Sequence, residues 1–251
     1  MKQLVHLLAS VCALIFMIVP CMSGESIKVF AAASLRNALN ELVADYEYPV
    51  AISYGGSGQI ARQAALGAPV DIVILANEAW MDWLEMRQLL APDTRKTLLG
   101  NRLVLVGVKA GVVDDTAESI LEYLDGGRLA MGMTRSVPAG IYGRQWLEST
   151  GMWPHLKRHL AETENARAAL ALVSRGETPM GLVYLSDALS DKTLDILLEA
   201  DPAHHEPIRY SGAVMAKRET EITVGFIRHL ASLYAARVFM SHGFSVSGAD
   251  Q

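Results

Sequence analysis

Short apolar runs alternate along the chain with segments in which hydrophobic residues recur every three or four positions. Runs of four to eight apolar residues are typical of strands, and the longer recurrence is typical of helices. The first set predicts strands at 26–33, 49–54 and 69–75, and helices at 34–43, 59–66 and after Asn77. Because consecutive β-α-β units give parallel strands covered by helices on both faces, this set predicts one open α/β sheet.

A second set of the same kind follows the apolar run 103–108. It predicts further strands at 128–132, 180–184 and 211–216, and helices at 117–124, 139–150, 153–160, 166–175 and 221–242. Two α/β units in 251 residues favour two small lobes that face each other across a cleft. We therefore assign 25–103 with 212–251 to lobe 1 and 104–211 to lobe 2.

The N-terminus has the pattern of a secretory signal peptide. Lys2 is followed by 4–20, a run without Asp, Glu, Lys or Arg, and then by the small-residue stretch 21–24. We expect residues 1–24 to be removed, with cleavage after Ser23 or Gly24, and the mature protein to lie in the periplasm.

Two other readings of this segment remain open. A membrane anchor wants about 20 apolar residues, whereas this run contains His6 and ends at Pro20. Cys21 could be lipidated, but Pro20 directly before it departs from a lipoprotein signal. Both readings are weaker than cleavage.

Composition narrows the function further. The only cysteines, Cys12 and Cys21, lie in the signal segment, so the mature chain would lack disulfides, thiol nucleophiles and cysteine-bound zinc. The net charge of −5 gives no basic footprint for nucleic acid, and a hydrophobic content of 51% excludes a disordered chain.

Four predicted strand-to-helix turns carry small or hydroxyl residues and no Lys or Arg, although Arg36, Arg62 and Arg135 lie nearby. The turns are Ala33-Ser34, Gly56-Ser57-Gly58, Pro138-Ala139-Gly140 and Asn165-Ala166. The first N–H groups of a helix lack intrahelical partners and carry partial positive charge, so several such ends can hold an anion together. Taken singly, Ser34 and Ser57 could be no more than helix N-caps.

Enzyme templates do not match, and we expect no catalysis. The run Gly55–Gln59 lacks the last glycine of a nucleophile elbow and has no Lys-Ser/Thr for a phosphate loop. His155 and His159 have metal-ligand spacing, but without the rest of H-E-x-x-H they indicate a solvated helix face. A secreted serine hydrolase using Ser34 or Ser57 would need His155 or His242 to approach in the fold.

The chain resembles the periplasmic molybdate-binding proteins, the ModA family, which serve as receptors of molybdate ABC importers. The segments that carry the resemblance run in family order over the whole mature chain. They are Val29–Leu35, Ser57–Gln63, Leu98–Asn101, Val137–Tyr142, Ala168–Val173 and Gly181–Tyr184.

The resemblance implies a two-lobed periplasmic-binding-protein fold of type II, with a mainly parallel sheet in each lobe and the ligand between the lobes. It places the oxyanion ligands on Ser34, Ser57, Ala139, Ala166 and Tyr184: hydroxyl and backbone N–H of each serine, backbone N–H of each alanine, and the phenol. Molybdenum would be held as its oxyanion without direct metal ligands.

The resemblance also implies molybdate or tungstate as cargo, a membrane permease as partner, no resident cofactor and no nucleic acid. We further expect a monomer. A receptor of the same architecture for another small oxyanion, such as sulfate, is the alternative.

Overall fold

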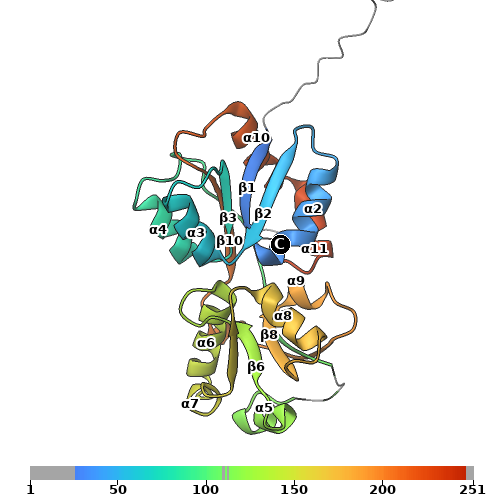
Figure 1. Ribbon diagram of the computed structural model, residues 1–251. Helices are drawn as coiled ribbons and strands as arrows, with labels where there is room; N and C mark the ends of the chain where they lie inside the picture. The colour runs from blue at the N-terminus through green and yellow to red at the C-terminus, as the bar shows by residue number, and fades with distance from the viewer. Residues whose placement is uncertain (1–25, 109–110, 112, 247–251) are drawn as a thin grey trace, which may run out of the picture.

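The chain folds into two lobes, each built on one five-stranded sheet with helices on both faces (Figure 1). The computed structural model describes residues 26–108, 111 and 113–246. The predicted signal peptide lies outside these residues. Within them, no helix has the length and apolar character needed to cross a membrane.

Lobe 1 contains both ends of the described chain. Its sheet has the order β2-β1-β3-β10-β4. Its elements are β1 (Ile27–Ala32), the 3₁₀ helix η1 (Ala33–Leu35), α2 (Arg36–Ala44), β2 (Val50–Gly55), α3 (Ser57–Ala65), β3 (Ile72–Leu75), α4 (Glu78–Glu85), β4 (Lys96–Gly100), β10 (Arg209–Val214), α10 (Glu221–Leu230) and α11 (Leu233–Ser241).

Lobe 2 is formed by the middle of the chain, and its sheet has the order β7-β6-β8-β5-β9. Its elements are β5 (Leu103–Gly107), α5 (Ala117–Leu124), β6 (Leu129–Gly132), α6 (Pro138–Ser149), α7 (Trp153–Leu156), β7 (Leu160–Thr163), α8 (Ala166–Ser174), β8 (Met180–Tyr184), α9 (Leu185–Ala188) and β9 (Asp195–Glu199). The short 3₁₀ helix η2 (Pro202–His204) lies on the return to lobe 1.

The two sheets have the same arrangement. In each, the fourth strand, β10 or β5, is antiparallel to both neighbours, and it is the strand that enters from the other lobe. The first three strands are parallel. The predicted α/β fold with two mainly parallel sheets is therefore confirmed.

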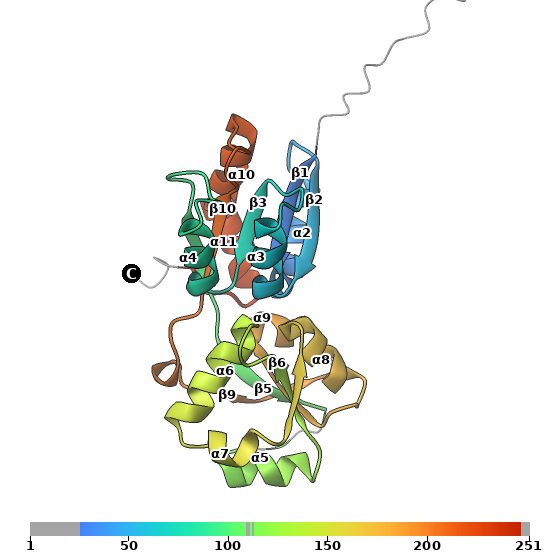
Figure 2. The same ribbon diagram turned by 60° about the vertical axis from the view of Figure 1, so that its left-hand side comes forward.

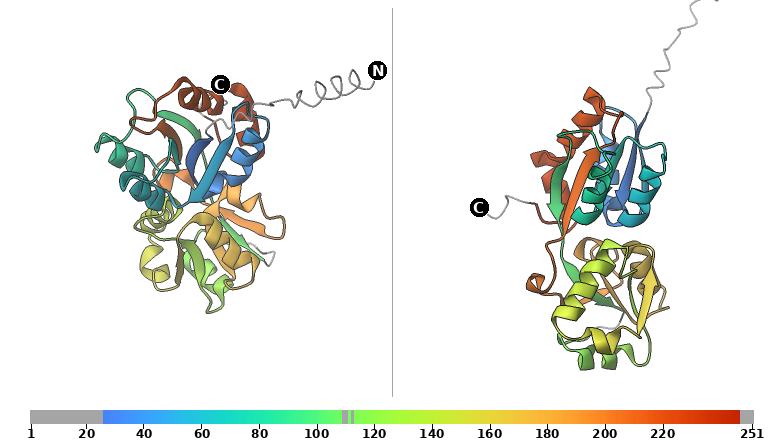
Figure 3. Two further views of the ribbon diagram at one scale, coloured as in Figure 1. Left: turned by 45° about the horizontal axis from the view of Figure 1, so that its top comes forward. Right: turned by 90° about the vertical axis from the view of Figure 1, so that its left-hand side faces the viewer.

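The chain passes between the lobes twice, and these two crossings run side by side at one edge of the molecule (Figure 2 and Figure 3, right). The first falls between β4 and β5, and the second between β9 and β10. The expected lobe boundaries need correction, since Leu103 already pairs within lobe 2 and residues 209–211 pair within lobe 1. Hydrophobicity marks the strands but not the sheet that each one joins.

Several predicted elements differ in extent. The predicted helix at 153–160 ends at Leu156, and its last position, Leu160, starts β7. The predicted helix at 221–242 is divided into α10 and α11, because the Ser232 hydroxyl accepts a hydrogen bond from Ala235 N and starts a new helix. Ser34 lies inside η1 and caps no helix.

Close packing of α6 on β6 requires glycine at two facing positions. A β-carbon on Gly140 would overlap the carbonyl oxygen of Gly132 and lie 2.6 Å from that of Met133. These are backbone atoms that a rotamer change cannot move aside. The start of α6 is thereby held directly against the end of its strand.

We expect Gly140→Ala to lower the free energy of unfolding by about 1–3 kcal/mol, because the helix must move away from β6. Gly225→Ala in α10 is the matched control, since the nearest atom to its β-carbon would be Tyr46 Oη at 3.9 Å. Urea unfolding of both variants measures the difference. Equal stability of the two would contradict the packing argument.

Candidate ligand-binding site between the lobes

The five predicted ligand residues all lie at or just after strand ends, at the edges where the lobes face each other. Ser34 and Ser57 come after β1 and β2 of lobe 1, and Ala139 and Ala166 come after β6 and β7, which hold the equivalent places in lobe 2. Tyr184 is the last residue of β8. All five residues are buried.

Contacts between backbones bring the starts of these helices together. A β-carbon on Gly56 would collide with the carbonyl oxygen of Glu164, and one on Gly58 would lie 2.5 Å from that of Ser136. The helix η1, which contains Ser34, contacts α8 and α9. Lobe 1 therefore closes directly onto the segments that precede Ala139 and Ala166.

Two side chains of lobe 1 also bind lobe 2. Trp80 Nε1 donates a hydrogen bond to Ser136 O at 3.2 Å, and Asn77 Nδ2 donates to Tyr142 Oη at 2.9 Å. Asn77 also caps α4 through its Oδ1, as predicted. The structure thus has the two lobes closed against each other.

Neither serine uses its hydroxyl to cap its own helix. The N-cap of α3 is Gly56, without a side-chain hydrogen bond, and Ser57 is the first helical residue. Ser57 Oγ instead accepts a hydrogen bond from Ala76 N at 3.0 Å, at the end of β3. The reading of Ser34 and Ser57 as simple N-caps is therefore wrong.

Ser34 belongs to a buried hydrogen-bond network that joins the two lobes. Its Oγ lies 2.9 Å from the hydroxyl of Tyr210 on β10. Asn101, between β4 and β5, donates from Nδ2 to Tyr210 Oη at 3.1 Å and to Ser186 Oγ at 2.9 Å. One amide at the crossing therefore contacts both lobes.

The Tyr184 hydroxyl is buried and makes no hydrogen bond of acceptable geometry with any described group. Its ring lies 5.9 Å from that of Tyr210. Burial raises the pKa of Tyr184 well above its usual value, and the neighbouring Tyr210 raises it further. The phenol is thus protonated and lacks a well-aligned acceptor among the described groups, an arrangement that costs about 1–3 kcal/mol unless a partner is supplied.

The other tyrosines around this point are donors as well. Burial raises the pKa of Tyr142 to about 12, and burial also raises the pKa of Tyr210. Neither phenol ionises at neutral pH, so none of them would repel an anion.

Backbone amides at the two helix starts of lobe 2 complete the donors. In α8, Asn165 Oδ1 accepts from Ala168 N at 2.9 Å, which leaves the amides of Ala166 and Arg167 ahead of it without an intrahelical acceptor. In α6 the first residue is Pro138, which has no N–H, so Ala139 supplies the first amide.

One cation close to the site escaped sequence analysis. Arg167 directly follows Ala166, and its Nε lies 2.6 Å from Oδ1 of the fully buried Asp187. The two side chains form an ion pair. Burial raises the pKa of Asp187 to about 6, against the lowering charge of Arg167. At neutral pH the ionised carboxylate compensates the arginine.

The arrangement does not support nucleophilic catalysis by either serine. Ser34 and Ser57 have the partners described above, and neither bonds a histidine. His242 pairs with Glu41 at 2.9 Å on the surface of lobe 1, and His155 is exposed on α7. Because α7 ends at Leu156, His159 does not share a helix with His155. Among the described residues, no group of three His, Cys, Asp or Glu could hold a metal ion.

Sequence reasoning missed Tyr210, Asn101, Asn77 and Tyr142 as members of this centre. Tyr210 and Asn101 are separated by 109 positions, and such distant pairs leave no periodic signal. Asn101 and Tyr142 did stand in the segments that carried the family resemblance, and this was the available hint.

Comparison with known proteins identifies the family of the chain. The family model of the bacterial extracellular solute-binding proteins matches residues 27–245. The chain is 39% identical to the molybdate-binding protein ModA of Escherichia coli, over 88% of the chain and 89% of that protein. It is 33% identical to ModA of Haemophilus influenzae, over 89% of the chain and 91% of that protein.

A solved structure supports the fold. The periplasmic molybdate-binding protein of Azotobacter vinelandii superposes with a TM-score of 0.78 at 21% identity, over 88% of this chain and 99% of that one. With two lobes, a centre of uncharged donors between them and these relatives, the chain belongs to the ModA family of bacterial extracellular solute-binding proteins, which are binding proteins and not enzymes.

Proposed function

We propose that the protein is a periplasmic receptor that captures molybdate between its lobes and delivers it to the membrane permease of an ABC importer. Ser34 and Ser57 would each bind the oxyanion through hydroxyl and amide, Ala139 and Ala166 through their amides, and Tyr184 through its phenol. The molybdate-binding relatives support the ligand, and the family's role in solute binding supports the importer.

The observation that carries this proposal is the unpaired Tyr184 hydroxyl. It is a buried donor beside the Ser34 network, at the point where the helix starts of both lobes meet. An oxyanion is the class of ligand that offers acceptors only. A ligand with its own donors would leave groups unpaired on both sides.

The serine hydroxyls are also turned into donors by their protein partners. Ser57 Oγ accepts a hydrogen bond from the backbone amide of Ala76. The hydroxyl hydrogen of Ser57 therefore remains available for a ligand. Tyr210 Oη accepts from Asn101 and can give its hydrogen to Ser34 Oγ, which leaves the Ser34 hydrogen for the same ligand. With these partners, each serine would have its own hydrogen available for a ligand.

Selectivity would follow from charge and size. Hydrogen bonds to a charged partner contribute about 1.5–3 kcal/mol each, so a full set offsets much of the dehydration of a dianion. A protonated anion such as HPO₄²⁻ would leave its O–H without an acceptor, at a cost of about 1–3 kcal/mol. The smaller sulfate would contact fewer donors at once, whereas tungstate is nearly the same size as molybdate and should bind as well.

Because no net charge faces the ligand, opening of the lobes would release it without breaking an ion pair. The lobes are connected by two adjacent crossings, the arrangement used for hinge closure. Release at the permease would then need the lobe contacts to separate, among them the hydrogen bonds of Trp80 and Asn77.

We expect molybdate and tungstate to raise the melting temperature of the mature protein more than sulfate or phosphate at equal concentration. Ligands that bind only the folded state stabilise it in proportion to their affinity. A thermal-shift series with the four anions measures this. The largest shift with sulfate would favour the alternative receptor, and no shift with any of the four would refute the proposal.

We expect Ser34→Ala and Ser57→Ala each to weaken molybdate binding by about 1.5–3 kcal/mol, or about ten- to a hundredfold in Kd. Isothermal titration calorimetry measures the loss, and Ser241→Ala, an exposed serine on α11, serves as the control. Unchanged affinity in both site variants would exclude these serines as ligands.

Removal of the Tyr184 hydroxyl should separate binding from stability. Tyr184→Phe should weaken molybdate binding by about 1.5–3 kcal/mol with little loss of unfolding free energy in the ligand-free protein, because no described group forms a well-aligned hydrogen bond with that hydroxyl. Tyr210→Phe should cost about 1–2 kcal/mol of stability, since it leaves Asn101 and Ser34 short of a partner. Calorimetry and urea unfolding test both, and equal loss of stability in the two variants would contradict the assignment.

A further inference from the structure

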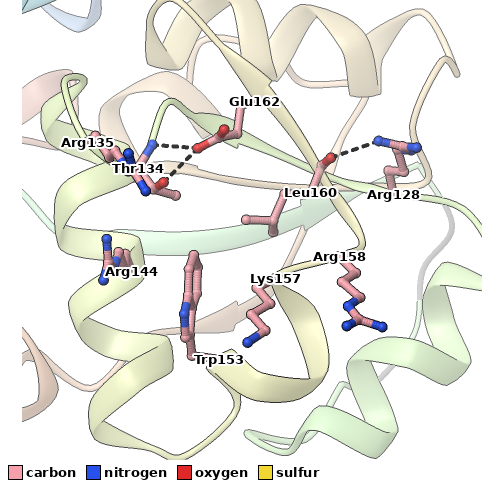
Figure 4. Close-up of a pocket in the computed structure, with 9 residues that line it drawn as sticks. All are labelled: Arg128, Thr134, Arg135, Arg144, Trp153, Lys157, Arg158, Leu160 and Glu162. Atoms are coloured by element: carbon pink, nitrogen blue, oxygen red, sulfur yellow. Dashed lines mark hydrogen bonds between the residues drawn. The ribbon is translucent and has the colours of Figure 1, made fainter.

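Lobe 2 carries a strongly basic hollow of about 790 Å³ between β7, α6 and α7 (Figure 4). One carboxylate, that of Glu162, lines it, and five cationic side chains surround it: Arg128, Arg135, Arg144, Lys157 and Arg158. The whole chain has a net charge of −5, so this concentration of positive charge does not follow from composition.

Most of this charge is not compensated nearby. Glu162 accepts hydrogen bonds from Thr134 N and Oγ1, both at 2.7 Å, and Arg144 pairs with Glu148 at 2.8 Å. Arg135, Lys157 and Arg158 form no ion pair within the described part of the chain. Figure 4 shows Trp153 standing between Arg144 and Lys157, and the Arg144 guanidinium lies 5.1 Å from the Trp153 ring.

One end of the hollow, at Arg135 and Glu162, lies on the side of lobe 2 that faces lobe 1. Arg135 directly precedes Ser136, whose carbonyl accepts the hydrogen bond from Trp80 of lobe 1. On the other side, Glu162 lies on the strand that leads to Glu164, which contacts Gly56 of lobe 1. Two residues that line the hollow, Arg135 and Glu162, are thus one and two positions in sequence from residues that contact lobe 1, and Lys157 lies at the end of α7.

The proposed site itself offers no long-range attraction. Its donors are hydroxyls and amides, whose dipole fields fall off faster with distance than the field of a charge, and Asp187 compensates Arg167. The net negative charge of the molecule repels a dianion. An uncompensated basic surface beside the entrance removes that difficulty, because it raises the local concentration of anions and guides them to the rim.

We propose that this hollow is the approach surface for the oxyanion cargo, so that charges recruit the dianion and uncharged donors hold it. The inference rests on the proposed function and adds the route of entry. The hollow acts before closure and does not touch the held ligand. It therefore governs the association rate and its dependence on salt, and leaves the dissociation rate unchanged.

The test is stopped-flow measurement of molybdate binding, followed by tryptophan fluorescence, since the Trp80 indole bonds across the lobes. In the double variant Lys157→Glu/Arg158→Glu, the association rate constant should fall by at least about threefold at about 20 mM salt. The difference should disappear at about 0.5 M salt, where charges are screened within a few ångströms. The dissociation rate constant should not change.

The control is Arg228→Glu/Arg237→Glu, on α10 and α11 of lobe 1, which changes the net charge by the same amount. Slowing by the Lys157/Arg158 variant alone supports the proposal. Equal slowing by both variants would show an effect of net charge only and overturn it, as would unchanged association in both. Calorimetry on the unsubstituted protein separates the two ideas: without molybdate binding there, the proposed function itself fails, and this inference fails with it.

Discussion

A dianion that is bound without a counter-charge must exchange its hydration shell for a complete set of protein donors. This requirement explains the main features of the proposed site. Single helix starts offer too few amides, so helix starts from two sheets have to meet. A hydroxyl serves as a donor to the anion only if its oxygen already accepts a hydrogen bond from another group. Ala76 N donates such a bond to Ser57 Oγ. The buried phenols remain protonated because burial raises their pKa.

The identical order of strands in the two sheets makes this meeting possible. Equivalent strands, β1 with β6 and β2 with β7, end at the facing edges, so their helices begin opposite one another. The glycines of the lobe 1 turn permit the approach, because side chains at Gly56 and Gly58 would collide with the backbone of lobe 2. The amide of Asn101 then joins the crossing to both halves through Tyr210 and Ser186.

Sequence analysis succeeded where burial leaves a simple pattern. The central strands β3, β5, β6 and β8 are buried at every position and read as continuous apolar runs. Edge strands β4, β7 and β9 were missed because they are partly exposed and mix charged residues with apolar ones. Local signals could not show them, since their pairing is settled by distant partners.

The features of the proposed site likewise fall into those that local sequence could show and those that it could not. Four helix starts were visible in the sequence, but Ala139 and Ala166 would act through backbone amides, which carry no side-chain signal, and only family resemblance singled them out. The partners that orient Ser34, by contrast, lie far away in the sequence, as Tyr210 does.

The late position of β10 has a consequence for biosynthesis. Lobe 2 is one uninterrupted stretch that possesses all its strands once Glu199 has been made. The sheet of lobe 1, however, lacks its fourth strand until β10 (Arg209–Val214) has been made. Within the described chain, β4 pairs only with that strand and with Ser245. As the chain is made, lobe 2 can therefore fold before lobe 1 does. A chain truncated before residue 209 would be unable to form the sheet of lobe 1 and would therefore lack half of the proposed ligand site.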